Sequence, residues 1–282
     1  MNNLSPLISP QELLSLQNDT HLFIFDASNS AASKARYSQE HLQGAFWIDL
    51  DTEIATIDPD LSKGGRHPLP SLENFSATLT KFGLKPEHKV IIYDEESAGN
   101  AAARLWWMLR AVGHEYVRVV DGGYQAAKSA GYSLSNDKPI HHNSQKYICN
   151  SWNLPLVNMQ DMDEIIKDDS YRIVDVRVDF RYKGIMEPID LIAGHIPGAV
   201  NSPYPDNLDK SGFYLPKDEM KAKYENIMKG YSPDKVVFYC GSGVSACHSI
   251  LAIAHAGLSI PKIYMGSWSE WSRNNRPMIL KK

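Results

Sequence analysis

The chain has 282 residues, of which 43% are hydrophobic, and a formal net charge of −4 at pH 7. This length allows one large domain or two of ordinary size. The slightly acidic balance, with no basic run before Lys281-Lys282, gives no reason to expect nucleic acid as a partner. Three cysteines are too few for a disulfide framework, so we expect free thiols in a reducing compartment.

The first 16 residues have neither the charged start nor the apolar stretch of a secretory signal, and they lack the arginines of a transit peptide. No apolar run approaches the roughly 20 residues that a membrane-spanning helix needs. We therefore expect a cytoplasmic protein without a membrane partner.

Short apolar runs alternate with helical patterns along the chain. Helices are predicted over residues 10–17, with Pro10 in the first turn, over 71–82 and over 100–112. A strand is predicted over 22–26. Alternation of strands and helices indicates a parallel-rich sheet covered by helices, in which ligands bind at the carboxyl ends of the strands.

The sequence repeats itself in its second half. Four segments recur in the same order at offsets of 144 to 154 residues: 22–28 with 171–177, 41–45 with 195–199, 90–94 with 236–240, and 119–124 with 263–268. This period is too long for a solenoid and indicates two copies of one domain. The predicted fold class is α/β, with tandem domains over 1–143 and 152–282 and a polar linker around 133–151.

The two copies differ at the end of one predicted strand. Cys240 stands there in the second copy, whereas Asp94 stands at the matching position in the first. A carboxylate cannot replace a thiol as nucleophile. We therefore expect the second copy to carry the chemistry and the first to be catalytically inactive.

Cys240 ends a run of four β-formers, 236–239, and a helix is predicted from Ser245 to Ala256. Gly241 and Gly243 can adopt the positive φ angles of a tight turn between them. Free backbone N–H groups and the positive end of the helix dipole would then converge on the sulfur and favour a thiolate. The pattern predicts an exposed, reactive thiolate cradled by its own loop.

Three other chemistries fit this loop less well. A cysteine phosphatase needs a phosphate-gripping arginine where the chain has Ala246. The loop matches the glycine pattern of dinucleotide-binding proteins, but the stretch from Leu258 to Trp268 lacks the acidic residue that would bind the ribose. Redox pairing of Cys240 with Cys247 stays open, although a small apolar role for Cys247 is favoured. Sulfur transfer, in which the thiolate takes up a sulfane sulfur as a persulfide, needs the features that the loop offers.

The chain resembles the tandem-domain rhodanese-type sulfurtransferases, the family of thiosulfate and 3-mercaptopyruvate sulfurtransferases, over essentially its whole length. The resemblance rests on His41-Leu42-Gln43-Gly44-Ala45, Trp106-Trp107-Met108-Leu109-Arg110, Val120-Asp121-Gly122-Gly123, Gly194-His195-Ile196-Pro197-Gly198-Ala199, Cys240-Gly241-Ser242-Gly243-Val244-Ser245-Ala246-Cys247 and Gly266-Ser267-Trp268-Ser269-Glu270-Trp271. It implies two rhodanese-like domains, an active second domain and no cofactor. No Cys/His spacing suggests a metal site. His41 and His195 occupy equivalent positions in the two copies, and His41 belongs to the copy expected to be inactive. We therefore expect both histidines to have a structural role.

The resemblance also implies roles for single residues. Cys240 matches the nucleophile that forms the persulfide, and Arg181 matches an arginine that anchors the substrate. Ser242, His67 and Asp51 match a proton relay of the mercaptopyruvate enzymes. The other loop positions expected to bind the substrate sulfur are Gly241, Gly243, Val244 and Ser245.

The identity of the sulfur donor stays open between 3-mercaptopyruvate and thiosulfate, both small anions. The loop is of the mercaptopyruvate type, but Ile189 stands where those enzymes usually carry a second arginine. The resemblance implies cyanide, a small thiol or a reduced thioredoxin-like protein as acceptor. The alternative is a non-catalytic module that binds a partner or senses oxidants through this loop.

Overall fold

The computed structural model describes residues 4–99, 101–139 and 145–280. The chain forms two compact units: unit 1 holds 1–54, 70–153 and 209–214, and unit 2 holds 55–69, 154–208 and 215–282. The sequence predicted two continuous domains and did not anticipate that 55–69 packs with unit 2, or 209–214 with unit 1. Part of the predicted linker, including His141 and His142, lies outside the described residues, as does Asn100 at the start of a predicted helix.

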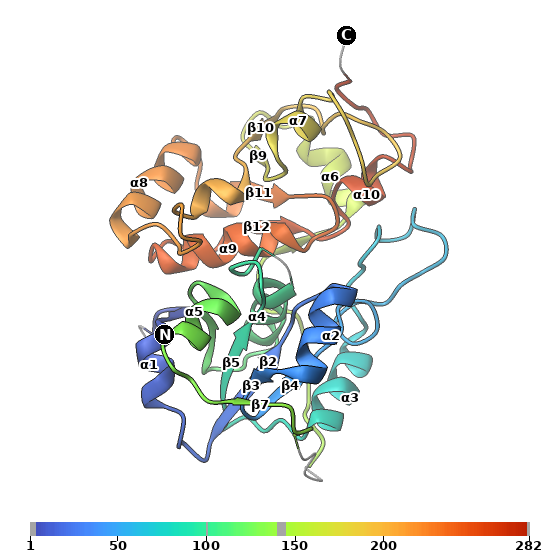
Figure 1. The fold of residues 1–282 in the computed structure, drawn as a ribbon. Coiled ribbons are helices and arrows are strands. Elements are labelled where there is room, and N and C mark those ends of the chain that lie inside the picture. The colour runs from blue at the N-terminus through green and yellow to red at the C-terminus, as the bar shows by residue number, and fades with distance from the viewer. Residues whose placement is uncertain (1–3, 100, 140–144, 281–282) are drawn as a thin grey trace. The chain divides into compact units, whose positions relative to one another are not determined.

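Unit 1 contains a five-stranded sheet of order β1-β6-β5-β2-β4, in which all neighbouring strands are parallel (Figure 1). The strands are β1 (Leu7–Ile8), β2 (Leu22–Asp26), β4 (Ala45–Trp47), β5 (Lys89–Tyr93) and β6 (Val117–Val120), and an antiparallel pair joins β3 (His41–Leu42) to β7 (Leu134–Ser135). The helices are α1 (Pro10–Ser15), α2 (Ala31–Gln39), α3 (Leu72–Phe82), α4 (Ala101–Ala111) and α5 (Gly123–Ser129). The helices predicted over 10–17, 71–82 and 100–112 correspond to α1, α3 and α4.

Helices cover both faces of the unit 1 sheet because alternate strand residues point to opposite sides. Ile24 of β2 packs with Leu13 of α1 and Ala127 of α5 in one buried cluster. The next residue, Phe25, meets Phe82 of α3 edge to face, with ring centroids 5.2 Å apart. The strand residues are therefore buried on both faces, as is usual in parallel sheets.

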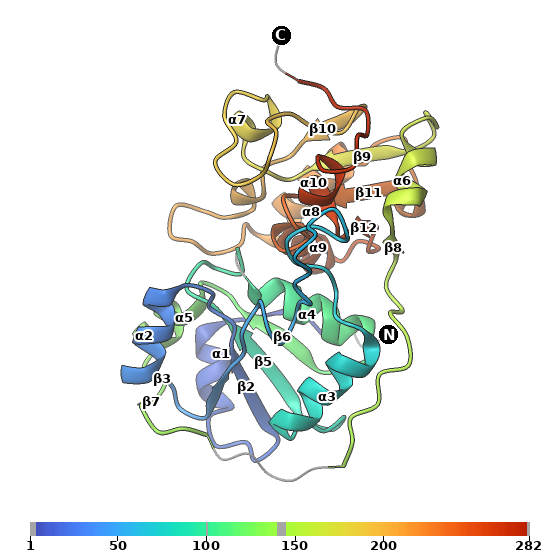
Figure 2. The ribbon, with the colours of Figure 1, turned by 90° about the vertical axis from the view of Figure 1, so that its right-hand side faces the viewer.

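Unit 2 repeats this architecture with a parallel sheet of order β10-β9-β11-β12-β8 (Figure 2). Its strands are β8 (Leu156–Val157), β9 (Arg172–Asp175), β10 (Ala199–Asn201), β11 (Val236–Tyr239) and β12 (Lys262–Tyr264). Its α-helices are α6 (Met159–Ile165), α7 (Asp179–Tyr182), α8 (Lys217–Ile227), α9 (Ser245–His255) and α10 (Ser267–Trp271), with 3₁₀ turns at Tyr204–Asn207 and Pro233–Lys235. One buried cluster joins the sheet to Met162 of α6 and Trp271 of α10.

The predicted repeat and fold class are confirmed, because β2, β5 and β6 hold the places in the first sheet that β9, β11 and β12 hold in the second. The two repeated histidines have matching contacts. His41 stacks on Tyr37 with ring centroids 4.1 Å apart, and its Nδ1 lies 2.7 Å from the Tyr37 carbonyl oxygen. His195 does the same with Tyr182, at 4.0 Å and 2.8 Å. These contacts agree with the expected structural role.

Among the helices of the described segments, none combines the length and the apolar composition that crossing a membrane would require.

Candidate active site

The candidate nucleophile lies between the last residue of β11 and the first turn of α9. Cys240 follows four fully buried strand residues, and the loop after it returns the chain into α9. Gly243 has a φ of +74°, and a Cβ there would lie 2.5 Å from the Met265 carbonyl oxygen, so only glycine fits. Within the part of the chain that the structure describes, the backbone N–H groups of Ser242, Val244 and Ser245 have no acceptor. The loop therefore offers free donors at a helix N-terminus.

The equivalent loop of unit 1 shows what this type of loop can bind. The buried carboxylate of Asp94 stands in the place of Cys240 and accepts N–H bonds from Glu96 at 2.9 Å and Ala98 at 2.8 Å. By the repeat offset, Glu96 and Ala98 correspond to Ser242 and Val244. Burial raises the pKa of Asp94 to about 6, against the effect of these backbone hydrogen bonds. The loop geometry thus places donors around an acceptor group carried by the residue that ends the strand.

Asp94→Asn is expected to relieve a pH-dependent cost of folding. The folded pKa of about 6 lies above the ordinary value of 3.8, so the stability that this group contributes is lost as the pH rises through 6. Relative to the variant, the wild type should lose about 1 to 2 kcal/mol of unfolding free energy between pH 5 and pH 7.5. Urea denaturation of both proteins at the two pH values measures this. A constant difference between the proteins would contradict it.

Cys240 is only 1% exposed, so the prediction of an exposed thiol is wrong. The loop is held against the start of α10, where the carbonyl oxygens of Cys240 and Gly241 accept N–H bonds from Trp268 at 3.0 Å and Ser269 at 2.8 Å. Cys247 is buried in α9, and its Sγ lies 3.3 Å from the Gly243 carbonyl oxygen. All three cysteines are free thiols.

Two of the predicted relay residues, both in unit 2, lie in contact. His67 Nδ1 lies 2.8 Å from Ser242 Oγ, two residues beyond Cys240. Asp51 belongs to unit 1 and is exposed, and its backbone N–H donates to Asp49 Oδ1 at 3.1 Å. Partial burial and the nearby charge of Asp49 raise the pKa of Asp51. A relay role for Asp51 stays a prediction.

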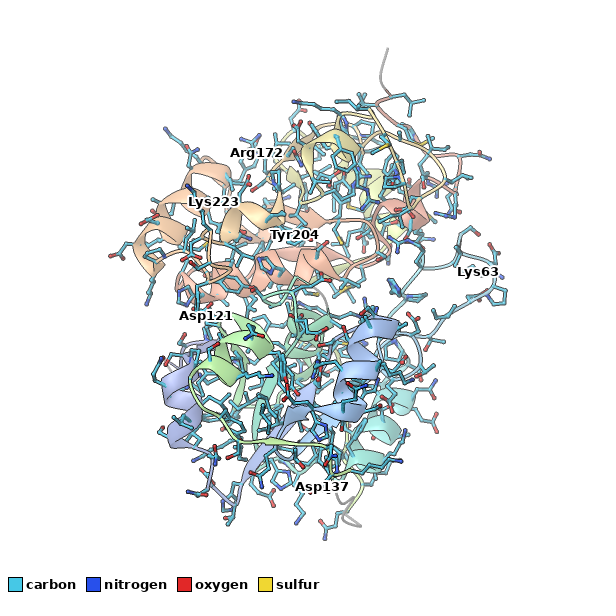
Figure 3. All side chains as sticks on the ribbon, viewed as in Figure 1. Lys63, Asp121, Asp137, Arg172, Tyr204 and Lys223 are labelled. Atoms are coloured by element: carbon cyan, nitrogen blue, oxygen red, sulfur yellow. The ribbon has the colours of Figure 1, made fainter. Side chains whose placement is uncertain are left out.

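Hydrogen bonds between residues far apart in the sequence hold the segment 55–69 against the rest of unit 2. The Gly64 N–H donates to Glu270 Oε1 at 2.8 Å, and the Asn274 amide donates to the Ser62 carbonyl oxygen at 2.8 Å. Lys63, labelled in Figure 3, lies in the same segment. These bonds position the residues that follow, including His67.

Two arginines lie over the first residue of the loop. A Cβ on Gly241 would lie 2.9 Å from Arg66 Nη2 and 3.4 Å from Arg181 Nη2. Arg181 was predicted at the site, whereas Arg66 was missed, although it directly precedes His67 in the sequence. The absence of a side chain at Gly241 leaves room for both guanidinium groups next to Cys240.

A buried carboxylate orients these two guanidinium groups. Asp190, whose side chain is fully buried, accepts from Arg66 Nε at 3.1 Å and from Arg181 Nη2 at 3.1 Å. Glu187 also accepts from Arg181, and this hydrogen bond keeps the pKa of Glu187 low although burial acts in the opposite direction. The arrangement fixes both arginines in rotamers that face the loop.

The charges around the loop do not balance. The arginine cluster contains four guanidinium groups and three carboxylates: Arg66, Arg177, Arg181 and Arg273 with Asp175, Glu187 and Asp190. One positive charge remains, which favours a small anion beside Cys240.

Ile189, which replaces an expected arginine, has no direct part in this cluster. Ile189 is 54% exposed, and its backbone N–H donates to Glu187 Oε1 at 3.0 Å. The second guanidinium beside Gly241 therefore belongs to Arg66. Within the described ranges, no group of three or more His, Cys, Asp or Glu side chains is arranged to hold a metal ion.

Comparisons with known proteins agree with this fold. The rhodanese-like domain model matches residues 9–130 and 158–274. A probable 3-mercaptopyruvate sulfurtransferase from Pseudomonas aeruginosa is 34% identical over 277 residues and covers 96% of both chains. A putative thiosulfate sulfurtransferase from Mycobacterium tuberculosis is 35% identical over 257 residues, covering 86% of this chain and 84% of that protein.

Solved structures extend the comparison. The 3-mercaptopyruvate sulfurtransferase from Leishmania major superposes with a TM-score of 0.84 at 29% identity, covering 98% of this chain and 76% of that chain. The chain therefore belongs to the rhodanese family of sulfurtransferases and carries the rhodanese-like domain twice.

Proposed function

We propose that the protein transfers sulfane sulfur from 3-mercaptopyruvate or thiosulfate to a thiophilic acceptor through a persulfide on Cys240. The observation that carries this proposal is the donor arrangement around Asp94. The matching N–H groups of Ser242 and Val244 would face the outer sulfur of a Cys240 persulfide. Such donors stabilise a sulfur anion strongly because the loop holds them in place before the negative charge forms.

The first half-reaction forms the persulfide. Arg66 and Arg181 bind the negative group of the donor and place its sulfur against Cys240. The thiolate attacks this sulfur, and a new S–S bond forms as the bond from the sulfur to the rest of the donor breaks. With thiosulfate, sulfite leaves with the electron pair. With 3-mercaptopyruvate, the enolate of pyruvate leaves and takes up a proton.

Ser242 and His67 supply the proton that only the enolate needs. The 2.8 Å contact between Ser242 Oγ and His67 Nδ1 allows the hydroxyl to give up its proton and to be reprotonated from the imidazole. Sulfite is stable as an anion, so this relay would not assist a thiosulfate reaction.

The second half-reaction returns the thiolate. The acceptor attacks the outer sulfur and takes it, so the whole reaction is a ping-pong cycle. Cyanide and small thiols fit this step, and a reduced thioredoxin-like protein is the proposed larger acceptor.

The donor is tested by comparing wild type with Ser242→Ala and His67→Gln. We expect kcat with 3-mercaptopyruvate to fall by about 10²-fold in each variant, because general acid catalysis is typically worth at least this much. Turnover of thiosulfate should change by less than about threefold. Ser249→Ala, which removes a buried hydroxyl of α9, serves as the control. Equal losses with both donors would contradict the relay.

A further inference from the structure

Ser267, the first residue of α10, has a strained backbone beside Cys240. It is fully buried and has a φ of +54°, in the left-handed region that residues other than glycine rarely adopt. Such conformations persist where the surrounding structure imposes them, often at functional sites. The contacts of its side chain indicate which groups this conformation brings the hydroxyl close to.

The Ser267 hydroxyl connects several groups around the reacting sulfur. Its oxygen accepts the backbone N–H groups of Cys240 and Gly243, both at 3.1 Å. Its single proton has two acceptors within reach: the Tyr264 carbonyl oxygen at 2.8 Å and Cys240 Sγ at 3.9 Å. Rotation about one bond therefore decides whether the sulfur receives a hydrogen bond.

The matching position in unit 1 is Gly123, which has a similar φ of +62°. A Cβ there would lie 2.4 Å from the Asp94 carbonyl oxygen, so a serine does not fit. The neighbouring backbone bonds are alike, since Tyr124 N donates to the Asp94 carbonyl oxygen at 2.9 Å, as Trp268 N does to that of Cys240. The hydroxyl is thus present in the copy that has a thiol and absent from the copy that has a carboxylate.

We propose that the Ser267 hydroxyl is a switchable hydrogen-bond donor that stabilises the Cys240 thiolate as it leaves the persulfide. This inference rests on the proposed function. In the persulfide, negative charge lies on the outer sulfur, and the hydroxyl donates to the Tyr264 carbonyl oxygen. When the acceptor bonds to the outer sulfur, the S–S bond breaks and its electron pair moves to Sγ. The hydroxyl then turns toward Sγ, and its proton stays on Oγ throughout.

The test separates the two half-reactions in single-turnover experiments. Wild type, Ser267→Ala and Ser267→Gly are first loaded with donor and then mixed with cyanide, and loss of the persulfide is followed by mass spectrometry. We expect the cyanide step to slow by roughly 10- to 100-fold in both variants, as for loss of a hydrogen bond to a charged group. The loading step should not slow in the same way, because there the thiolate is the attacking group and loses its negative charge as the S–S bond forms. Ser272→Ala is the control, because that buried hydroxyl has no partner within the described chain.

Ser267→Gly keeps the test informative if the alanine variant does not fold, because glycine adopts this backbone conformation without strain. A merely structural role for Ser267 predicts equal slowing of both steps. That result, or a cyanide step at the wild-type rate, would overturn the inference. Failure of the wild type to load sulfur would instead refute the proposed function.

Discussion

Cys240→Ser is expected to reduce sulfur transfer from both donors by on the order of 10⁴-fold or more, as when the nucleophile of another covalent enzyme is removed. A serine hydroxyl is close in size to the thiol, and the loop is held by backbone bonds to α10 that the change leaves in place. The variant should therefore melt near the wild-type temperature. Thiocyanate formation from each donor and cyanide measures the loss.

The other two cysteines provide the controls for this result. Cys149→Ser should retain wild-type turnover, because burial raises the pKa of its thiol to about 11 and keeps it neutral. Cys247→Ser should retain most turnover, because a serine hydroxyl can replace its bond to the Gly243 carbonyl oxygen. A loss with Cys247→Ser as large as with Cys240→Ser would instead support redox pairing of these two residues.

Arg66→Gln and Arg181→Gln should each lower kcat/KM by roughly 10- to 100-fold, mainly by raising KM for the donor. Each change removes a charge-assisted hydrogen bond to the donor anion. Each also removes the one positive charge by which the arginine cluster exceeds its carboxylates. Steady-state kinetics with 3-mercaptopyruvate and thiosulfate measures both effects.

Two further variants sharpen this prediction. Arg276→Gln is the matched control, since that guanidinium pairs with Asp163 instead of the cluster. Ile189→Arg in the Arg66→Gln background should recover part of the lost kcat/KM for 3-mercaptopyruvate by restoring a second guanidinium. Wild-type kcat/KM in Arg66→Gln would show that Arg66 does not bind the donor.

The sequence was sufficient to predict the repeat and the succession of strand, loop and helix around Cys240. The run 236–239 is apolar throughout, as expected for a strand that is buried on both faces. A thiol between such a strand and a turn of small residues must lie at the carboxyl end of the strand. The contrast of Cys240 with Asp94 also identified the domain expected to carry the chemistry. These are local signals, carried by residues next to one another in the chain.

The missed features depend on contacts between residues far apart in sequence. The Gly64–Glu270 bond joins residues 206 positions apart, and it places the segment with Arg66 on unit 2. Burial of Cys240 follows from the docking of its loop on α10, which no property of the loop itself reveals. The matching of Ser267 to Gly123 was visible in the sequence, but its meaning required the φ angle and the distance to Sγ.

The most direct test of the account is the intact mass of the wild-type protein after incubation with each donor. We predict a gain of one sulfur atom with at least one of the two donors, located by peptide mapping on Cys240 and removed by cyanide. No added sulfur with either donor, or sulfur located only on Cys149 or Cys247, would contradict a Cys240 persulfide and favour a non-catalytic module.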